Sequence, residues 1–297
     1  MKLFKKEKVG SRRILTICGM KFEYNTAKKY NFSEITESGV NKNTREKKII
    51  VSLTSFPARI PTLYITVSSL LNQTMKPDEV VLYLAKEQFP NLENNLPENL
   101  LRLKEFGLSI RWCNDIRSYK KLIPALKEFP DDIIITVDDD VYYDKKLVEL
   151  LYKSYEKAPQ YIHCHRITKI LLKNGKFKAK CKKCYKQPSF ANKLVGVGGV
   201  LYPPHSLYKD ICDEKLFTEL APTNDDIWFW LMAVLNNTKI VQIKNNIDEP
   251  AELEETQNGP CLCQINDNGE NLFYIQLENV FKHYAGLREK VINDMKN

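Results

Sequence analysis

The chain has 297 residues, which is enough for one large α/β domain or two modest ones. Its hydrophobic content of 43% and aromatic content of 10% are typical of a globular protein and exclude a disordered one. No apolar run approaches the ~20 residues of a membrane-spanning helix, and the basic N-terminus lacks the apolar stretch of a signal peptide. These features predict a cytoplasmic protein.

The net charge of +8 is concentrated at the N-terminus. Residues 1–48 contain 13 Lys or Arg and 5 Asp or Glu, whereas the rest of the chain contains 32 of each. Basic and aromatic residues together suit peripheral contact with an anionic membrane, here the inner membrane face, and a solvated tail is the alternative. The neutral main body offers no basic groove, so we expect no nucleic-acid partner.

In chain order, the basic appendage over residues 1–48 is predicted to contain a short strand pair, around Arg13–Cys18 and Met20–Tyr24. The main domain, residues 49–297, starts with a buried strand at Ile49–Thr54 and a helix from about Pro61 to Asn72. Strands and helices then alternate: a strand at Val80–Leu84, a helix near Leu100–Phe106, a strand near Ser109–Trp112, a helix at Tyr119–Phe129 and a strand at Ile133–Val137. This alternation predicts an α/β fold with a mostly parallel, Rossmann-like sheet and helices on both faces.

The second half of the chain is less regular. Its expected elements are strands at 162–165 and 169–172, a basic loop or hairpin at 173–186, a glycine-rich strand region at 195–202, a helix at 226–236, a strand at 240–243, a polar loop over 248–271 and a last helix from about Glu278.

Three consecutive aspartates, Asp138, Asp139 and Asp140, close the most apolar strand of the chain. Such carboxylates repel one another unless a cation or a proton intervenes. Alternate side chains of an extended segment share a face, so Asp138 and Asp140 are expected to point the same way. Their oxygens suit Mg²⁺ or Mn²⁺, and ligands of parallel sheets bind at the carboxyl ends of strands. Helix capping by Asp140 or Asp144 is the alternative, which explains one acid rather than three.

A second acidic pair, Asp225 and Asp226, precedes a predicted helix. Ordinary helix capping is one interpretation, and a general base that faces the metal site is the other. A glycine-rich run lies before this pair and contains Gly198 and Gly199. Glycine weakens a strand unless a backbone or a ligand must approach closely, so the run favours either a bulged core strand or a ligand site.

Isolated basic residues complete the candidates. Arg59 and Lys121 follow or precede predicted strands, where cations suit a phosphate-bearing substrate, and simple surface charge is the alternative for each. His283 can complete the coordination of a carboxylate-bound metal, although a lone histidine is more often a surface or core residue. Cys181 and Cys184 form a CxxC near two histidines, for which reduced thiols are favoured over a zinc site.

Taken together, these residues resemble a nucleotide-sugar glycosyltransferase of the GT-A fold, similar to the bacterial glycosyltransferase family 2. The segments that carry the resemblance occur in the family's order between residues 49 and 286: IIVSLTSFPARI, LLNQTMKPDEVVLYL, SYKKL, IIITVDDD, VGVGGVLYPP and TNDDIWFW. The resemblance implies a nucleotide-binding half over about residues 49–140 and an acceptor half over about residues 141–297.

The resemblance also implies roles for the acids. Asp138 and Asp140 would belong to the DxD motif that holds Mn²⁺ or Mg²⁺, with Asp139 and Asp140 as the alternative pair, and His283 would complete the metal shell. Asp226, or otherwise Asp225, matches the acid that deprotonates the acceptor hydroxyl in inverting enzymes.

Substrate contacts follow in the same way. The resemblance places Thr54, Arg59 and Lys121 at the nucleotide, and Asp139, Gly198 and Gly199 are further candidates for substrate binding. Many family members carry a base-contacting aspartate after the second strand, which this chain lacks, and a uridine nucleotide is the leading expectation.

The implied function is transfer of a sugar from a nucleotide sugar to a glycan or lipid-linked acceptor in bacterial surface polysaccharide synthesis. Two alternatives are a nucleotidyltransferase on a related sheet, which would release pyrophosphate, and a catalytically idle module that binds sugar nucleotides.

Overall fold

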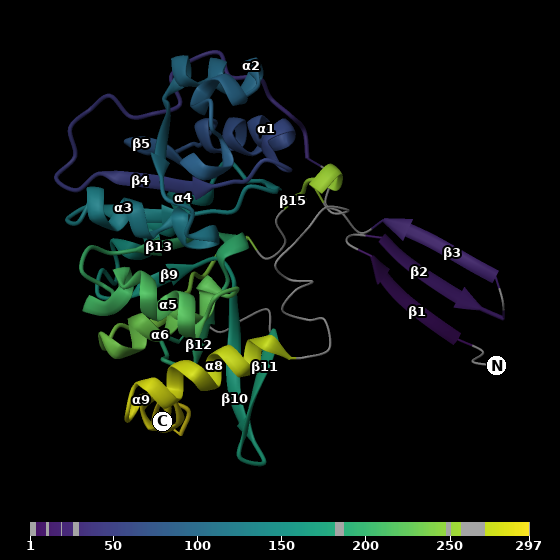
Figure 1. Cartoon of the computed structure of the whole chain (residues 1–297), viewed down its shortest axis with the longest axis vertical. Coiled ribbons are helices and arrows are strands. Elements are labelled where there is room, and N and C mark those ends of the chain that lie inside the picture. Colours follow the sequence, from purple (N-terminus) through teal and green to yellow (C-terminus); the bar gives the residue numbers. More distant parts are fainter. Residues whose placement is uncertain are drawn as a thin grey trace.

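The computed structural model describes residues 4–9, 12–18, 20–25, 30–181, 187–247, 251–256 and 271–296. Its centre is a seven-stranded sheet, whose strands are β4 (Ile49–Thr54), β5 (Glu79–Ala85), β6 (Leu108–Cys113), β7 (Ile133–Thr136), β9 (Ile162–Cys164), β13 (Val200–Tyr202) and β14 (Ile240–Gln242). The order is β14-β9-β13-β7-β4-β5-β6 (Figure 1). Only β13 runs antiparallel to its neighbours. The predicted α/β class with a mostly parallel sheet is confirmed.

Both faces of the sheet are buried because its strands are apolar on both sides. In β4, Ile49, Val51 and Leu53 belong to one hydrophobic cluster and Ile50 to the other, and all four are fully buried. Side chains alternate along a strand, so a continuous apolar run supplies two cores. This explains why Ile49–Thr54 and Ile133–Thr136 are recognisable in the sequence.

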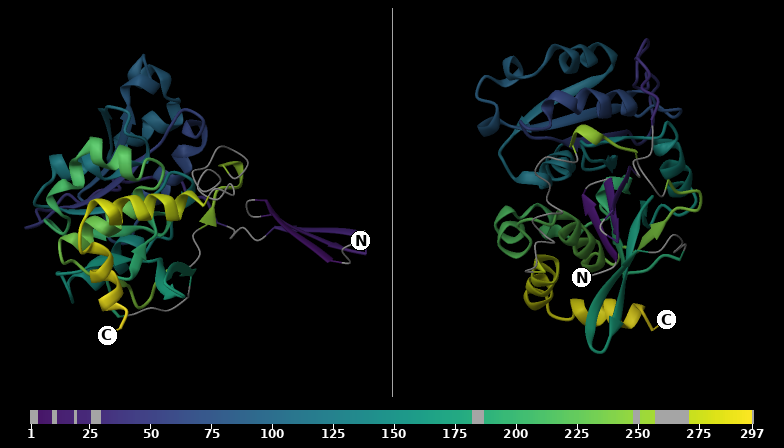
Figure 2. Two further views of the ribbon diagram at one scale, coloured as in Figure 1. Left: turned by 60° about the horizontal axis from the view of Figure 1, so that its bottom comes forward. Right: turned by 90° about the vertical axis from the view of Figure 1, so that its right-hand side faces the viewer.

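Helices cover both faces of the sheet, as predicted (Figure 2). One face carries α1 (Ile60–Leu71), α2 (Glu98–Leu101) and α4 (Leu147–Tyr155). The other carries α3 (Ile123–Glu128), α5 (Glu214–Leu220), α6 (Asp225–Leu235), α8 (Leu272–His283) and α9 (Leu287–Asp294).

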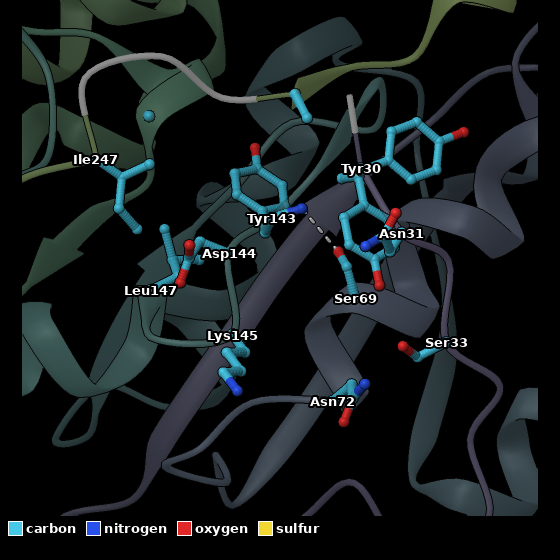
Figure 3. Close-up of a pocket in the computed structure, with 13 residues that line it drawn as sticks. Tyr30, Asn31, Ser33, Ser69, Asn72, Tyr143, Asp144, Lys145, Leu147 and Ile247 are labelled. Carbon is cyan, nitrogen blue, oxygen red and sulfur yellow. Dashed lines mark hydrogen bonds between the residues drawn. The ribbon is translucent and has the colours of Figure 1, made fainter. Parts of the chain in front are cut away.

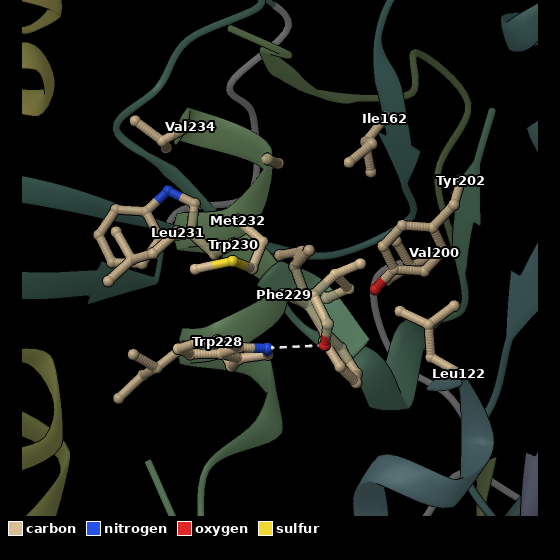
Figure 4. Packing of buried hydrophobic residues seen from close by; sticks show 14 of the residues in the cluster. Leu122, Ile162, Val200, Tyr202, Trp228, Phe229, Trp230, Leu231, Met232 and Val234 are labelled. Atoms are coloured by element: carbon tan, nitrogen blue, oxygen red, sulfur yellow. Dashed lines mark hydrogen bonds between the residues drawn. The ribbon is translucent and has the colours of Figure 1, made fainter. Parts of the chain in front are cut away.

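Helix α6 lies at the centre of its layer. Every residue from Ile227 to Val234 is fully buried, as expected for a helix that is apolar all round. The two buried indoles each donate to a backbone carbonyl. Trp228 Nε1 donates to Ile211 O at 3.1 Å (Figure 4), and Trp230 Nε1 donates to Phe190 O at 2.7 Å. The rigid setting of α6 fixes the position of the two acids at its first turn.

Several predicted elements differ from the structure. The helix expected near Leu100–Phe106 is the short α2 followed by a 3-10 helix at Arg102–Phe106. The helix expected at Tyr119–Phe129 is divided into a 3-10 helix at Arg117–Lys121 and α3, because Pro124 suits the start of a new helix rather than its middle. The glycine-rich region is a strand only over β13, and Gly196–Gly198 form a 3-10 turn before it. The last helix expected from Glu278 begins at Leu272, and α9 follows it.

Two smaller sheets flank the main one. In the first, β10 (Ile167–Lys173) lies between β11 (Lys176–Cys181) and β12 (Asn192–Leu194), so the expected basic loop or hairpin is a hairpin as far as it is described. The second pairs β8 (Val141–Tyr142) with β15 (Ala251–Glu252), inside the segment predicted as a polar loop. Residues 182–186, 248–250 and 257–270 lie outside the described residues, and so does Cys184.

The N-terminal appendage forms a three-stranded antiparallel sheet of β1 (Phe4–Val9), β2 (Arg12–Ile17) and β3 (Met20–Asn25), set beside the main body (Figures 1 and 2). It contains the predicted strand pair and adds β1. Residues further along already pack on the main body, since Gly39 N donates to Phe106 O at 2.8 Å and Arg45 pairs with Asp78 at 2.8 Å. Within the described residues, no helix has both the length and the apolar character needed to cross a membrane.

Candidate active site

The three aspartates lie just beyond the carboxyl end of β7, next to β4, and Asp139 is turned into the protein. Ser55 Oγ donates to its Oδ2 at 2.6 Å, and Arg59 Nη1 lies 2.5 Å from its Oδ1. The side chain of Asp139 is 8% exposed, against 28% for Asp138 and 19% for Asp140. Asp138 and Asp140 are therefore the two acids that remain accessible.

Asp140 is crowded by negative charge. Burial, followed by the charges of Asp139 and Asp138, raises the pKa of its carboxyl to about 7, although Arg59 at 3.0 Å opposes the rise. The N-cap of α4 is Lys146, and no side chain caps this helix; Asp144 Oδ1 accepts from Lys146 N at 2.9 Å in the turn before it. Neither Asp140 nor Asp144 is therefore a helix cap in the described structure, and capping does not account for the triplet.

Lys121 joins the aspartate triplet to the second acidic pair. Its ammonium lies 2.9 Å from Asp138 Oδ1 and 2.9 Å from Asp225 Oδ2, and only 7% of its side chain is exposed. Burial alone would lower the pKa of Lys121, but Asp138, Asp225 and Asp226 hold it well above its ordinary value. This lysine is therefore a fixed positive charge between the two acidic groups.

The acids at the start of α6 are not needed to cap it. Asn224 is the N-cap, and its side chain accepts from Ile227 N at 3.2 Å. Asp225 instead accepts from Ser118 Oγ at 2.9 Å and is buried, with burial raising the pKa of its carboxyl. Its partners make it a supporting residue.

Asp226 is the more accessible acid of the pair, with 21% of its side chain exposed. Gly196 N lies 3.2 Å from its Oδ1, and Lys193 Nζ lies 3.3 Å from its Oδ2. Burial would raise the pKa of this carboxyl, but Lys193, Lys121 and the Gly196 amide hold it below its ordinary value. Asp226 is therefore an ionised carboxylate in a site that water can reach.

Gly196 marks the point where these groups meet. A Cβ atom at this position would lie 2.8 Å from Lys121 Nζ, 3.0 Å from Asp226 Oδ1 and 3.5 Å from Asp138 Oδ1. Only glycine allows the backbone to approach the three charged groups so closely. The structure thus brings together Asp138, Lys121 and Asp226 from three segments that are distant in sequence.

Three of the residues predicted to bind substrate have structural contacts within the fold. Thr54 donates its hydroxyl to Tyr83 O at 2.7 Å at the end of β4. Gly198 abuts the aliphatic stem of Arg166, and Gly199, with φ of +87°, abuts Leu147, so these two glycines permit packing rather than face the aspartates.

His283 is not brought to the aspartates, and its expected place in their metal shell is corrected. Helix α8 packs on α5 and α6, which leaves His283 exposed at the last turn with its ring 4.7 Å from that of Tyr284. Among the residues that the structure describes, no three His, Cys, Asp or Glu side chains gather closely enough to hold a metal ion.

The remaining donors still fit a hard divalent cation. Asp138 and Asp140 provide carboxylate oxygens, the ligands that Mg²⁺ and Mn²⁺ prefer, and Mg²⁺ usually retains several waters. Lys121 and Arg59 each engage one oxygen of these carboxylates, which leaves the second oxygen of each without a charged partner among the described residues. Two aspartates without the histidine are therefore the candidate donor set.

The histidines near the CxxC are core residues. His163 is fully buried, its Nδ1 lies 2.9 Å from Ser154 Oγ and its Nε2 lies 3.0 Å from Ala158 O. The nitrogens of buried His165 lie 2.9 Å from Ile247 N and 3.3 Å from Leu147 O. A zinc ion would have to displace these bonds.

Three further residues that contact the acids, Gly196, Lys193 and Ser118, are not among the candidates predicted from the sequence. Gly196 could have been found as part of the glycine-rich run, which carried a visible signal. Lys193 and Ser118 are ordinary residues in ordinary segments, and only the folded chain shows that each contacts one of the acids.

No protein-family model and no curated protein sequence matches the chain. Among solved structures, it is similar to S. aureus TarS 1–349, with 16% identity, a TM-score of 0.48 and coverage of 71% of this chain and 61% of that one. It is also similar to the mannosyltransferase PcManGT from Pyrobaculum calidifontis in complex with GDP-Man and Mn²⁺, with 10% identity, a TM-score of 0.44 and coverage of 71% and 58%.

A third similar structure is CMP:2-keto-3-deoxy-manno-octonic acid synthetase complexed with CTP, with 14% identity, a TM-score of 0.38 and coverage of 69% of this chain and 94% of that one. The chain spans about three fifths of the length of the first two structures. Because the scores are low, the assignment of function rests on the residues of the site.

Proposed function

We propose that the chain is a metal-dependent glycosyltransferase that moves a sugar from a nucleotide sugar, with a UDP-sugar as first choice, to a glycan or lipid-linked acceptor. The supporting observation is the convergence of Asp138, Lys121 and Asp226 on Gly196. Accessible carboxylates for a cation thus stand beside a separate, ionised carboxylate. This pairing suits a reaction with an anionic leaving group and a hydroxyl nucleophile.

In this proposal Asp138 and Asp140 hold Mn²⁺ or Mg²⁺, which, when bound, neutralises charge on the leaving nucleoside diphosphate. Arg59 orients Asp139 and Asp140 and offers a cation toward the phosphates. Lys121 keeps the accessible carboxylate of Asp138 in place. These residues would form the nucleotide-binding half, over about residues 49–140.

Asp226 is the proposed general base for the acceptor hydroxyl. Lys193 and the Gly196 amide orient its carboxylate, and its lowered pKa keeps it ionised at neutral pH. Direct attack with proton removal by Asp226 corresponds to an inverting reaction. Asp225 acts as a positioning residue through Lys121 and Ser118 rather than as the base.

The acceptor half would extend over about residues 141–297, and the basic appendage over residues 1–48 would hold the enzyme at the inner membrane face near lipid-linked acceptors. A role in bacterial surface polysaccharide synthesis follows from this combination of acceptor and location. The appendage supports the proposal through its seven Lys or Arg and two Asp or Glu within residues 1–25.

The test measures release of nucleoside diphosphate from UDP-, GDP- and TDP-sugars, with and without Mn²⁺, for the wild type and for Asp138→Asn. We expect metal-dependent release that falls at least ~100-fold in the variant, as for loss of a group that acts in the transition state. Asp131→Asn is the matched control, since this acid is exposed and pairs only with His205 among the described residues. Undiminished release by Asp138→Asn would contradict the proposal.

The released product distinguishes sugar transfer from the two alternative functions, a nucleotidyltransferase and an idle binding module. A nucleotidyltransferase would use the same acids but release pyrophosphate from a nucleoside triphosphate. An idle binding module would bind the nucleotide sugar in a titration and release nothing.

A further inference from the structure

A pocket of about 400 Å³ is lined by Tyr143, which follows the aspartate triplet in the chain (Figure 3). The hydroxyl of Tyr143 accepts from Asp138 N at 2.8 Å and lies 3.2 Å from Val197 O. One buried side chain therefore contacts both the pocket and the backbone of the proposed active site. The volume exceeds what a single pyranose ring needs and falls within the usual range for small-ligand sites.

The walls combine aromatic rings with polar side chains that have no hydrogen-bond partner among the described residues. Tyr30 and Tyr142 stack at 4.6 Å between ring centroids and are half-buried. The side chains of Asn31, Ser33 and Asn72 line the same pocket, are exposed, and make no hydrogen bond with any part of the chain that the structure describes.

We propose that this pocket binds a sugar unit of the glycan, as a second carbohydrate site beside the reactive centre. The C–H-rich face of a pyranose packs against an aromatic ring. Amide and serine side chains both donate and accept hydrogen bonds, as sugar hydroxyls do. The inference rests on the proposed function only in taking the glycan to be the acceptor or product of that reaction.

Charge distinguishes this ligand from a nucleotide. Among the described residues that line the pocket, Lys145 is the single cation and the neighbouring Asp144 is the single acid. A nucleotide phosphate calls for several cations or backbone amides, whereas a neutral polyhydroxylated ligand needs none. A nucleoside without phosphate could still stack on the tyrosines, so it serves as the competing ligand in the test.

The experiment uses the full chain and ligand-observed NMR with the methyl glycosides of glucose, galactose, mannose and N-acetylglucosamine, each at about 20 mM, and with uridine. For an open single-sugar pocket we expect dissociation constants on the order of 1 mM for at least one glycoside. Tyr30→Ala and Asn72→Ala should each weaken this binding at least ~5-fold. Both residues lie outside the helices and strands, which makes loss of folding an unlikely cause. Tyr161→Ala, which lies outside the pocket, is the control.

The variant Asp138→Asn separates this inference from the proposed function, because it should lose turnover and keep glycoside binding. Absence of glycoside binding to the wild type, or binding that both pocket variants retain in full, overturns the inference even if sugar transfer is observed. Uridine binding that the pocket variants abolish, without glycoside binding, also overturns it and assigns the pocket to a nucleoside.

Discussion

Gly196 places a backbone amide where any side chain would obstruct three charged groups. The amide donates to Asp226, and the space beside its Cα is occupied by Lys121 Nζ and the carboxylates of Asp138 and Asp226. A methyl group here must push apart groups that hold one another by charge. The residue is therefore tied to the geometry of the site rather than to the stability of the fold.

We predict that Gly196→Ala lowers kcat for sugar transfer at least ~10-fold, since a displacement of about 1 Å in a catalytic group can cost ~100-fold. The control is Gly175→Ala, at a φ of +71° in the β10–β11 turn with no atom within 4 Å of the new Cβ. Strain at positive φ should cost the control about 1 kcal/mol in the free energy of unfolding without changing kcat. Equal kcat for both variants would contradict the role given to Gly196.

His163 is buried as a neutral imidazole, and burial lowers its pKa to about 4. The unfolded chain, with a histidine pKa near 6.5, binds the proton more readily than the folded chain. The contribution of neutral His163 is therefore fully present above about pH 6.5 and is lost as the pH falls toward 4, by up to roughly 3 kcal/mol.

The expected signature is a free energy of unfolding that decreases from pH 6.5 to 4.5 in the wild type and decreases less steeply in His163→Gln. Urea unfolding at several pH values measures both slopes. His205→Gln is the control for the substitution itself, because His205 is exposed, with 74% of its side chain accessible. Identical slopes in His163→Gln and the wild type would contradict the assignment.

At the scale of elements, the sequence predicts those features that depend on neighbouring residues alone, such as buried strands and the alternation of side chains along them. The runs that became β4 and β7 are apolar on both faces, and this pattern is visible without tertiary information. The accessible acids Asp138 and Asp140 were expected from the same alternation. The break between the 3-10 helix at Arg117–Lys121 and α3 depends on Pro124. A proline at this position is itself a sequence signal for the start of a new helix.

What could not be predicted depends on packing between elements. His283 belongs to α8, and the position of α8 is set by its contacts with α5 and α6 rather than by the residues around the histidine. Lys193 precedes the glycine-rich run with no motif of its own, yet the fold sets it against Asp226. Neither outcome follows from periodicity or spacing.

The appendage sheet also has a testable face. In the register of β2 and β3, Ile17 pairs with Met20 and Leu15 with Phe22, and directly paired residues share a face. The side chains of Ile17, Met20 and Phe22 are 36%, 62% and 50% exposed. We predict that the double variant Met20→Asp, Phe22→Asp weakens binding to vesicles of phosphatidylglycerol and phosphatidylcholine at least ~10-fold, because it removes two apolar contacts and adds repulsive charge.

Vesicle sedimentation measures this binding, and Thr16→Asp, on the opposite face, is the control for charge alone. Deletion of residues 1–25 should abolish binding altogether. Vesicle binding that survives the deletion would leave the solvated-tail interpretation of the appendage in its place.

At the scale of the whole molecule, the two expected halves share one sheet. Strand β13 comes from the second half and hydrogen-bonds to β7 from the first, with Val200 opposite Thr136 and Tyr202 opposite Ile134. On the other side β13 pairs with β9. The division at about residue 140 therefore stays a functional proposal, while the main sheet is continuous across it.

We therefore predict a single cooperative unfolding transition for the main body. Trp112 packs beside Phe89 on one face of the sheet, and Trp228 and Trp230 lie in the core of the other face. Fluorescence of Trp112→Phe and of the double variant Trp228→Phe, Trp230→Phe reports the two faces separately. Coincident midpoints in urea are expected, and two separated transitions would contradict a shared core.

The reversed strand β13 has a consequence for how a substrate enters. The turn that holds Gly196 leads directly into β13, which is bonded along its length to the strand that carries the aspartates. Rotation of one half against the other would break those bonds, so the two halves cannot move as separate rigid bodies about a hinge. In the proposed reaction, substrate entry and product release would then depend on motions of surface segments beside a rigid sheet. Turnover should be sensitive to solvent viscosity through those segments alone.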